Sequence, residues 1–86
     1  MLNLPQLNDP SKRVLQLIRE RGVVSGWQIL SETGVTDQQL LDAANQLVKF
    51  SLVLAKGNIY KPDEIGKAYF SLVPSSSNLA DQVLRS

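Results

Sequence analysis

The 86-residue chain contains neither cysteine nor histidine. Without thiolates or imidazoles it has no disulfide framework, no usual zinc ligand set and no serine–histidine catalytic pair. Most mechanisms open to a small enzyme are thereby excluded. The adjacent acids Asp63 and Glu64 are explained by helix capping and by the helix dipole. We therefore expect no enzymatic activity, no catalytic residue, no metal and no cofactor.

Long apolar runs are also missing. No stretch approaches the ~20 apolar residues that cross a bilayer, and the first ten residues, MLNLPQLNDP, lack the basic and hydrophobic regions of a secretion signal. A chain of this length forms one domain, and its hydrophobic content of 43% supplies a modest core. The expected class is a soluble, cytoplasmic, single-domain protein.

A strong charge of one sign is the third absence. Nine Lys and Arg oppose eight Asp and Glu, so the net charge is +1 and no overall basic field attracts nucleic acid. The cations gather in two places instead. They lie on a first predicted helix, as Lys12, Arg13, Arg19 and Arg21, and near a predicted hairpin, as Lys56, Lys61 and Lys67.

The first third of the chain carries the signals of two helices. Asp9 is a capping residue followed by a proline, which predicts a first helix over residues 10–21. Ser25 and Gln28 have the spacing of a capping box, so a second helix starts there. It is expected to end near Thr33, before a left-handed cap at Gly34.

A third helix follows almost at once. Thr36 and Gln39 repeat the capping-box spacing, and the apolar positions after them continue at helical spacing to about Phe50. Two helices joined by residues 33–35 form a helix-turn-helix. The extended pair at residues 23–24 is expected to add a third, short strand to a hairpin further along the chain.

That hairpin is predicted in the segment from Lys49 to Val73. Residues 52–55 form an apolar run, and residues 57–58, Gly-Asn, favour a tight turn. Residues 59–61 would be the return strand. Asp63 would then cap a helix over residues 63–73. The apolar positions of this helix would be Ile65, Ala68, Tyr69, Leu72 and Val73.

The order of elements resembles the winged helix-turn-helix of bacterial transcription regulators, notably the MarR-like and PadR-like groups, over residues 10–73. In those families a wing strand ends in a pattern of the kind YxLTxxG, where Thr caps the next helix. Here Tyr60, Asp63 and Gly66 stand at the same spacing, with Pro62 in place of Leu. The resemblance implies an α+β fold with a three-helix core, a small antiparallel β-sheet wing and a C-terminal helix.

The residues on either side of this match suggest a division of the chain. Residues 1–8 would be a flexible N-terminal arm, and residues 9–73 the winged-helix domain. Residues 74–86 would be a serine-rich break followed by a short helical tail, which is marginal as an isolated helix.

The function that the resemblance implies is DNA binding in transcriptional regulation, with the third helix in the major groove and the wing on the backbone. Amide side chains pair well with adenine, so the expected base-reading residues are Gln38, Gln39, Asn45 and Gln46. The expected backbone contacts are Lys49, Lys56, Asn58, Lys61 and Arg13.

The third helix also departs from DNA-binding relatives. Asp37 and Asp42 oppose Lys49, which leaves a local charge of about −1 where phosphates would approach. This departure favours an alternative, in which the winged helix is a protein-protein interaction module that does not bind DNA.

Aromatic residues bear on the same choice. Trp27, Tyr60 and Tyr69 are interpreted as packing residues. Phe70 either covers the edge of the core or contacts a partner helix, in which case a homodimer would form through Phe70 and the C-terminal tail. The tail itself either folds back on the domain or pairs with a second copy.

Overall fold

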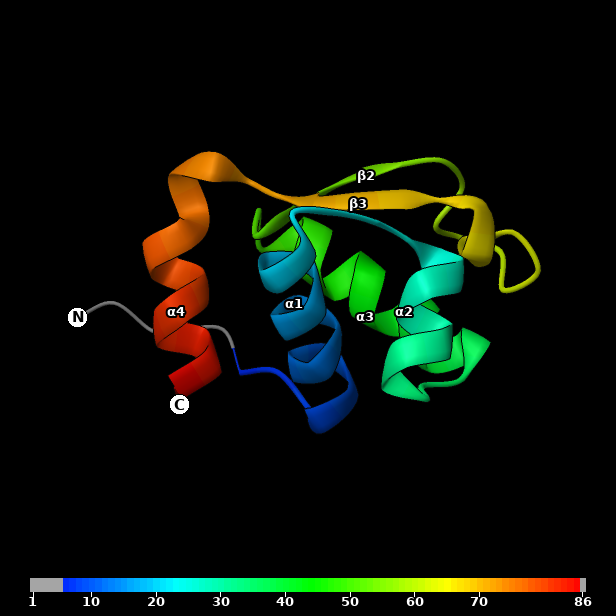
Figure 1. The fold of residues 1–86 in the computed structure, drawn as a ribbon, viewed down its shortest axis with the longest axis horizontal. Coiled ribbons are helices and arrows are strands. Elements are labelled where there is room, and N and C mark those ends of the chain that lie inside the picture. The colour runs from blue at the N-terminus through cyan, green and yellow to red at the C-terminus, as the bar shows by residue number, and fades with distance from the viewer. Residues whose placement is uncertain (1–5, 86) are drawn as a thin grey trace.

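Three helices lie beneath a small sheet, and a fourth helix stands beside the first (Figure 1). The computed structural model describes residues 6–85. Its α-helices are α1 (Asp9–Arg21), α2 (Gly26–Thr33), α3 (Asp37–Lys49) and α4 (Ser77–Arg85). The strands are β1 (Val23–Ser25), β2 (Val53–Lys56) and β3 (Tyr69–Leu72), and two short 3-10 helices are η1 (Ile65–Lys67) and η2 (Pro74–Ser76).

Local capping signals set the starts of the helices. The predicted capping boxes of α2 and α3 are both present, and α2 ends at Gly34 with φ 74°. The cap of α1 lies one residue earlier than expected. Asn8, rather than Asp9, accepts a hydrogen bond from the Ser11 amide, at 2.9 Å.

The sheet is antiparallel, with the strand order β1-β3-β2. Phe70 in the central strand is aligned with Val24 of β1 on one side and with Ala55 of β2 on the other. The predicted short strand at residues 23–24 is therefore confirmed, but it pairs with β3 rather than with a strand of the predicted hairpin.

The predicted course of the wing is wrong in two respects. Residues 59–61 form no strand, and residues 63–73 form no α-helix. The strand that pairs with β2 is β3, and residues 57–68 form a long loop, the wing loop, that contains η1. The apolar residues after Asp63 fit helical spacing, but Ala68, Phe70 and Leu72 also alternate with more polar neighbours. Residues 69–72 form a strand because they pair with β1 on one side and with β2 on the other.

The motif interpretation fails at the same place. Tyr60 is 75% exposed and does not pack on the core, and Asp63 lies in a turn rather than at the cap of an α-helix. Gly66 lies in η1. No α-helix follows the wing loop directly, and α4, after η2, corresponds to the short helical tail predicted within residues 74–86.

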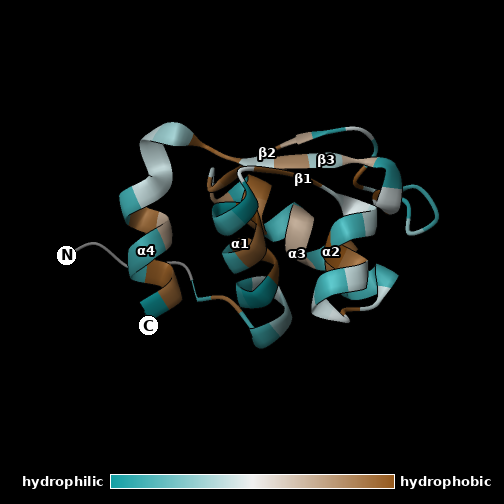
Figure 2. Cartoon of the chain, viewed as in Figure 1, coloured by the Kyte–Doolittle hydropathy of each residue, from teal (hydrophilic) through white to brown (hydrophobic). Residues whose placement is uncertain are grey.

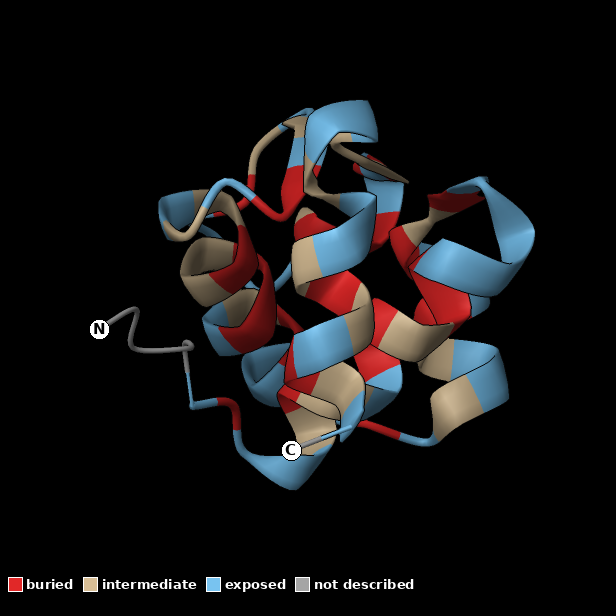
Figure 3. Ribbon diagram, turned by 90° about the vertical axis from the view of Figure 1, so that its left-hand side faces the viewer, coloured by how far each residue is buried: buried red, intermediate tan, exposed pale blue. Residues whose placement is uncertain are grey.

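The core lies between the sheet and the helices, and the apolar faces of α1, α2 and α3 turn toward it (Figures 2 and 3). Its largest fully buried side chains are Phe70, Leu15, Ile18, Ile29, Leu40, Leu47, Leu52 and Ile65. Leu7 from the predicted arm and Ala80 and Val83 from α4 are buried in the same cluster. The tail therefore packs on α1, and residues 1–5 of the predicted arm lie outside the described residues.

Two kinds of feature do not occur within residues 6–85. No helix there has both the length and the apolar character to cross a membrane. No three carboxylates in this range gather closely enough to hold a metal ion.

The turn between α3 and β2 contains a strained residue. Ser51 has φ 58°, a left-handed conformation that costs a non-glycine residue about 1–2 kcal/mol. Its amide donates to the Val48 carbonyl at 3.0 Å, and its carbonyl accepts from the Ser76 hydroxyl at 2.8 Å. Both hydrogen bonds use backbone atoms of Ser51, so they survive removal of its side chain.

Ser51→Gly should therefore raise the free energy of unfolding by about 0.5–1 kcal/mol, once the extra chain entropy of glycine is subtracted. Denaturant titration measures the change. Ser31→Gly, in the exposed interior of α2, is the matched control and should lower stability by about 0.5 kcal/mol. Loss of stability in both variants would show that Ser51 is not strained.

Candidate nucleic-acid interface

One face of α3 is open to solvent. Gln38, Asp42, Asn45 and Lys49 recur at spacings of three and four residues, so they share a face opposite the buried side of the helix. Gln38 donates to the Asp42 Oδ1 atom at 3.0 Å. This face, the α3 face, is where the expected contact with a DNA groove would occur.

Asn45 joins the α3 face to the wing loop. Its Nδ2 atom donates to the Leu41 carbonyl at 2.8 Å, one turn back in the helix, and to the Ile59 carbonyl of the wing loop at 2.7 Å. Because Asn45 belongs to α3, its hydrogen bond to Ile59 fixes the wing loop directly against the helix. The α3 face and the wing loop thus form one continuous surface.

Two glycines allow the base of the wing loop to approach α2 closely. A Cβ atom on Gly26 would lie 2.1 Å from the Ile65 carbonyl oxygen, and one on Gly66 would lie 2.8 Å from the indole of Trp27. The Gly26 amide also donates to the Ala68 carbonyl at 2.8 Å. Any larger side chain at either position would push the wing loop away from the helices.

The expected packing roles of Tyr60 and Tyr69 are wrong, and that of Trp27 is confirmed only at its contact with Gly66. Trp27 covers Gly66 with its ring yet remains 60% exposed, while Tyr60 projects from the wing loop. Tyr69 is exposed because it sits on the outer side of the sheet, next to the inward-facing Phe70. The sequence could have indicated this, since alternation within a strand places neighbouring aromatics on opposite faces.

Two of the predicted base-reading residues have structural contacts instead. The Gln39 side chain accepts from the Thr36 amide at 2.9 Å, as the capping box requires. Gln46 accepts from the hydroxyl of Ser11, a buried residue of α1, at 3.1 Å. The amide oxygen of Gln39 thus accepts a hydrogen bond at the exposed start of α3, and that of Gln46 accepts one in a partly buried position. Base contacts by these two residues stay a prediction.

The predicted cations of the wing remain exposed. Lys49, Lys56 and Lys61 lie on the surface, and Asn58 accepts from the Tyr60 amide at 2.8 Å, which shapes the loop. Ion pairs within residues 6–85 involve α1 instead. They join Arg19 to Asp81 of α4 at 2.6 Å, and Arg21 to Glu32 of α2. Exposed positive charge therefore lies at the wing and the end of α3, and also on α1 at Arg13.

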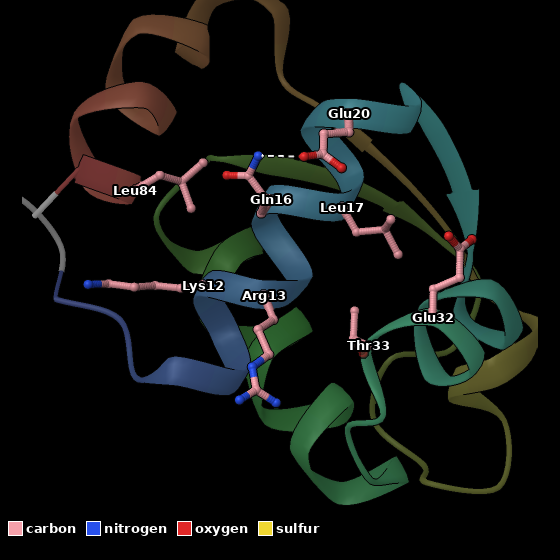
Figure 4. Close-up of a pocket in the computed structure, with 8 residues that line it drawn as sticks. All are labelled: Lys12, Arg13, Gln16, Leu17, Glu20, Glu32, Thr33 and Leu84. Atoms are coloured by element: carbon pink, nitrogen blue, oxygen red, sulfur yellow. Dashed lines mark hydrogen bonds between the residues drawn. The ribbon is translucent and has the colours of Figure 1, made fainter.

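Arg13 lies apart from this surface. Figure 4 shows it in an open hollow of about 470 Å³ between α1, the end of α2 and the end of α4. The hollow is lined by Lys12, Arg13, Gln16, Leu17, Glu20, Glu32, Thr33 and Leu84. Its walls carry charges of both signs, and Glu20 accepts from Gln16 at 2.8 Å. The structure thus does not bring Arg13 together with the wing lysines.

The outer face of the sheet is a second surface. Val23, Leu54 and Tyr69 are exposed there around a hollow of about 320 Å³. Phe70, which was expected to offer a contact for a homodimer, is only 1% exposed and belongs to the core. A dimer contact through Phe70 is therefore excluded, because β3 turns this side chain inward.

The hydrogen bond from Asn45 to the wing loop is expected to stabilise the fold, and this can be tested by mutation. Asn45→Ala leaves the Leu41 and Ile59 carbonyls without this donor, and should lower the free energy of unfolding by about 1–2 kcal/mol. Amide exchange in residues 57–64 should also become faster. Gln38→Ala removes only an exposed contact and should stay within about 0.5 kcal/mol of the parent. If Asn45→Ala and Gln38→Ala changed the free energy of unfolding equally, the assigned link between Asn45 and the wing loop would be contradicted.

Comparison with known proteins identifies the fold. The chain matches no family model and no curated protein. BpsR of Bordetella bronchiseptica, whose DNA binding is regulated by 6-hydroxynicotinic acid, superposes with a TM-score of 0.72 at 15% identity, over 93% of this chain and 58% of BpsR. A cysteine-to-serine mutant of ZitR from Lactococcus lactis gives 0.68 at 13%, over 95% and 53%. A cysteine-to-serine mutant of MarR from E. coli, solved with operator DNA, gives 0.68 at 16%, over 92% and 54%.

The chain therefore spans little more than half the length of these structural neighbours. They are winged-helix regulators of the MarR family. At this level of identity the likeness establishes architecture, and the fold of the chain is a winged helix-turn-helix of the MarR type.

Proposed function

We propose that this chain is a winged-helix DNA-binding domain that acts in transcriptional regulation in the bacterial cytoplasm. The α3 face would enter the major groove, and the wing loop would lie on the adjacent backbone. The observation that carries the proposal is the hydrogen bond from Asn45 to Ile59, which makes helix and loop one preformed surface. Structural neighbours described as binding DNA support it.

The phosphate contacts in this proposal come from few residues. Lys49 ends α3, Lys56 ends β2 and Lys61 lies in the wing loop, and all three are exposed. Three phosphate contacts correspond to a slope of roughly −3 when the logarithm of the binding constant is plotted against that of the salt concentration. Arg13 is not part of this surface, and a phosphate contact by it stays a prediction.

The test is titration of the chain with a mixed-sequence DNA duplex at several salt concentrations. Binding should weaken as salt rises, with the slope given above, and Lys61→Ala should reduce the slope by about 1. Arg85→Ala is the matched control, because α4 lies at the opposite end of the molecule from the wing loop (Figure 1). It should leave the slope unchanged. An absence of salt-dependent binding would refute the proposal.

A protein-protein interaction module is the second candidate function. The observation that favours it is the outer sheet face, where Val23, Leu54 and Tyr69 expose apolar surface beside a hollow. Lys56 is the charged residue among those that line it. This face is distinct from the α3 face, because it lies on the side of the sheet away from the helices (Figure 1).

Leu54→Ser separates the two functions. It removes apolar surface without touching α3, so DNA affinity should stay within twofold of the parent if the chain is a DNA-binding domain. Sedimentation at rising protein concentration tests the other candidate. If the sheet face is an interface between copies, the parent should associate and Leu54→Ser should remain monomeric, whereas identical masses would argue against that interface.

A further inference from the structure

The amide of Asn45 has its two hydrogens committed inside the fold. The atoms facing its Nδ2 are both carbonyl oxygens, of Leu41 and Ile59, so chemistry fixes which end of the amide turns toward them. The Oδ1 atom has no hydrogen-bond partner within residues 6–85 and is not enclosed. Asn45 therefore offers the surface an acceptor and no donor.

Asp42, one turn earlier on the α3 face, has the same character. It is exposed, and an ionised carboxylate accepts hydrogen bonds only. Gln38 donates to its Oδ1 atom at 3.0 Å, which helps to hold the carboxylate on this face. The centre of the α3 face is thus a pair of acceptors, Asp42 and Asn45, at a spacing of three residues.

Acceptors discriminate between bases in the major groove. Guanine presents two acceptors there, N7 and O6, which an acceptor on the protein repels. Adenine also presents an amino donor, but the acceptor N7 beside it repels a second acceptor. Bidentate pairing of adenine with an Asn needs a free amide hydrogen, which Asn45 lacks. Cytosine presents the N4 amino group, a donor, and an acidic side chain can accept from it.

We infer that Asp42 and Asn45 are specificity-determining residues that select cytosine amino groups in the major groove. The inference rests on the proposed DNA binding and names the bases read by that same surface. It gives the negative charge of Asp42 a role in recognition. Lys49 lies on the same face, two turns after Asp42, at the C-terminal end of α3. It supplies positive charge for the phosphates.

Selection from a duplex library with a randomised core tests the inference. The parent chain should enrich cytosine at one or two positions, with a preference of roughly 5- to 150-fold over guanine. Asp42→Asn keeps the size of the side chain and adds a donor, so one enriched position should change from cytosine to adenine. Asp37→Asn is the matched control, because it removes the same charge from α3 at its first residue. It should raise affinity for all sequences and leave the selected bases unchanged.

The possible outcomes are distinct. Salt-dependent binding of the parent with no cytosine preference, or with guanine enriched, would overturn the inference and leave the proposed function standing. An Asp42→Asn variant that selects the same bases as the parent would also overturn it. If the parent binds no duplex at any salt concentration, the proposed function and the inference fall together. Circular dichroism of each variant confirms that it is folded, as expected for changes at exposed positions.

Discussion

The contact between the wing loop and the helices is the constraint on which the surface of this protein depends. Asn45 holds the loop through the Ile59 carbonyl, and the Gly26 amide holds its far end through Ala68. Close approach at Gly26 and Gly66 leaves no room for the loop to shift toward α2. These contacts, together with the burial of Ile59, Ile65 and Ala68, keep a twelve-residue connection beside α3. The entropic cost of ordering the wing loop is therefore met on folding rather than on binding.

This arrangement suits a chain with almost no net charge. A strongly basic protein can attract DNA through its overall field, but a chain of charge +1 must place its few cations where they act together. The ion pairs of Arg19 and Arg21 stabilise contacts of α1 with α4 and α2, and leave the exposed lysines at the wing and the end of α3. Recognition by such a surface relies on geometry and on the pattern of donors and acceptors.

Local signals allowed much of the fold to be predicted, and non-local pairing accounts for the rest. The capping boxes at Ser25 and Thr36 set α2 and α3 because their hydrogen bonds span only three residues. Strand β3 was not predicted, because its partner in β1 is 46 residues away and its apolar spacing also fits a helix. At the site, Gln39 was assigned both to the capping box of α3 and to base reading, and this conflict was visible in the sequence. The contacts of Asn45 and Gln46, by contrast, depend on tertiary structure. The sequence placed Asp42 on the exposed face but gave no sign that Asn45 beside it would lack a donor.

The central claim is that the α3 face and the wing loop form one DNA-binding surface. Backbone amide chemical shifts recorded by NMR during titration with duplex DNA at low salt test it most directly. The account predicts that changes gather at residues 38–49 and 56–61, and that Val23, Leu54 and the exposed side of α4 are unaffected. Changes centred on the outer sheet face, or a spectrum that DNA does not alter, would contradict it.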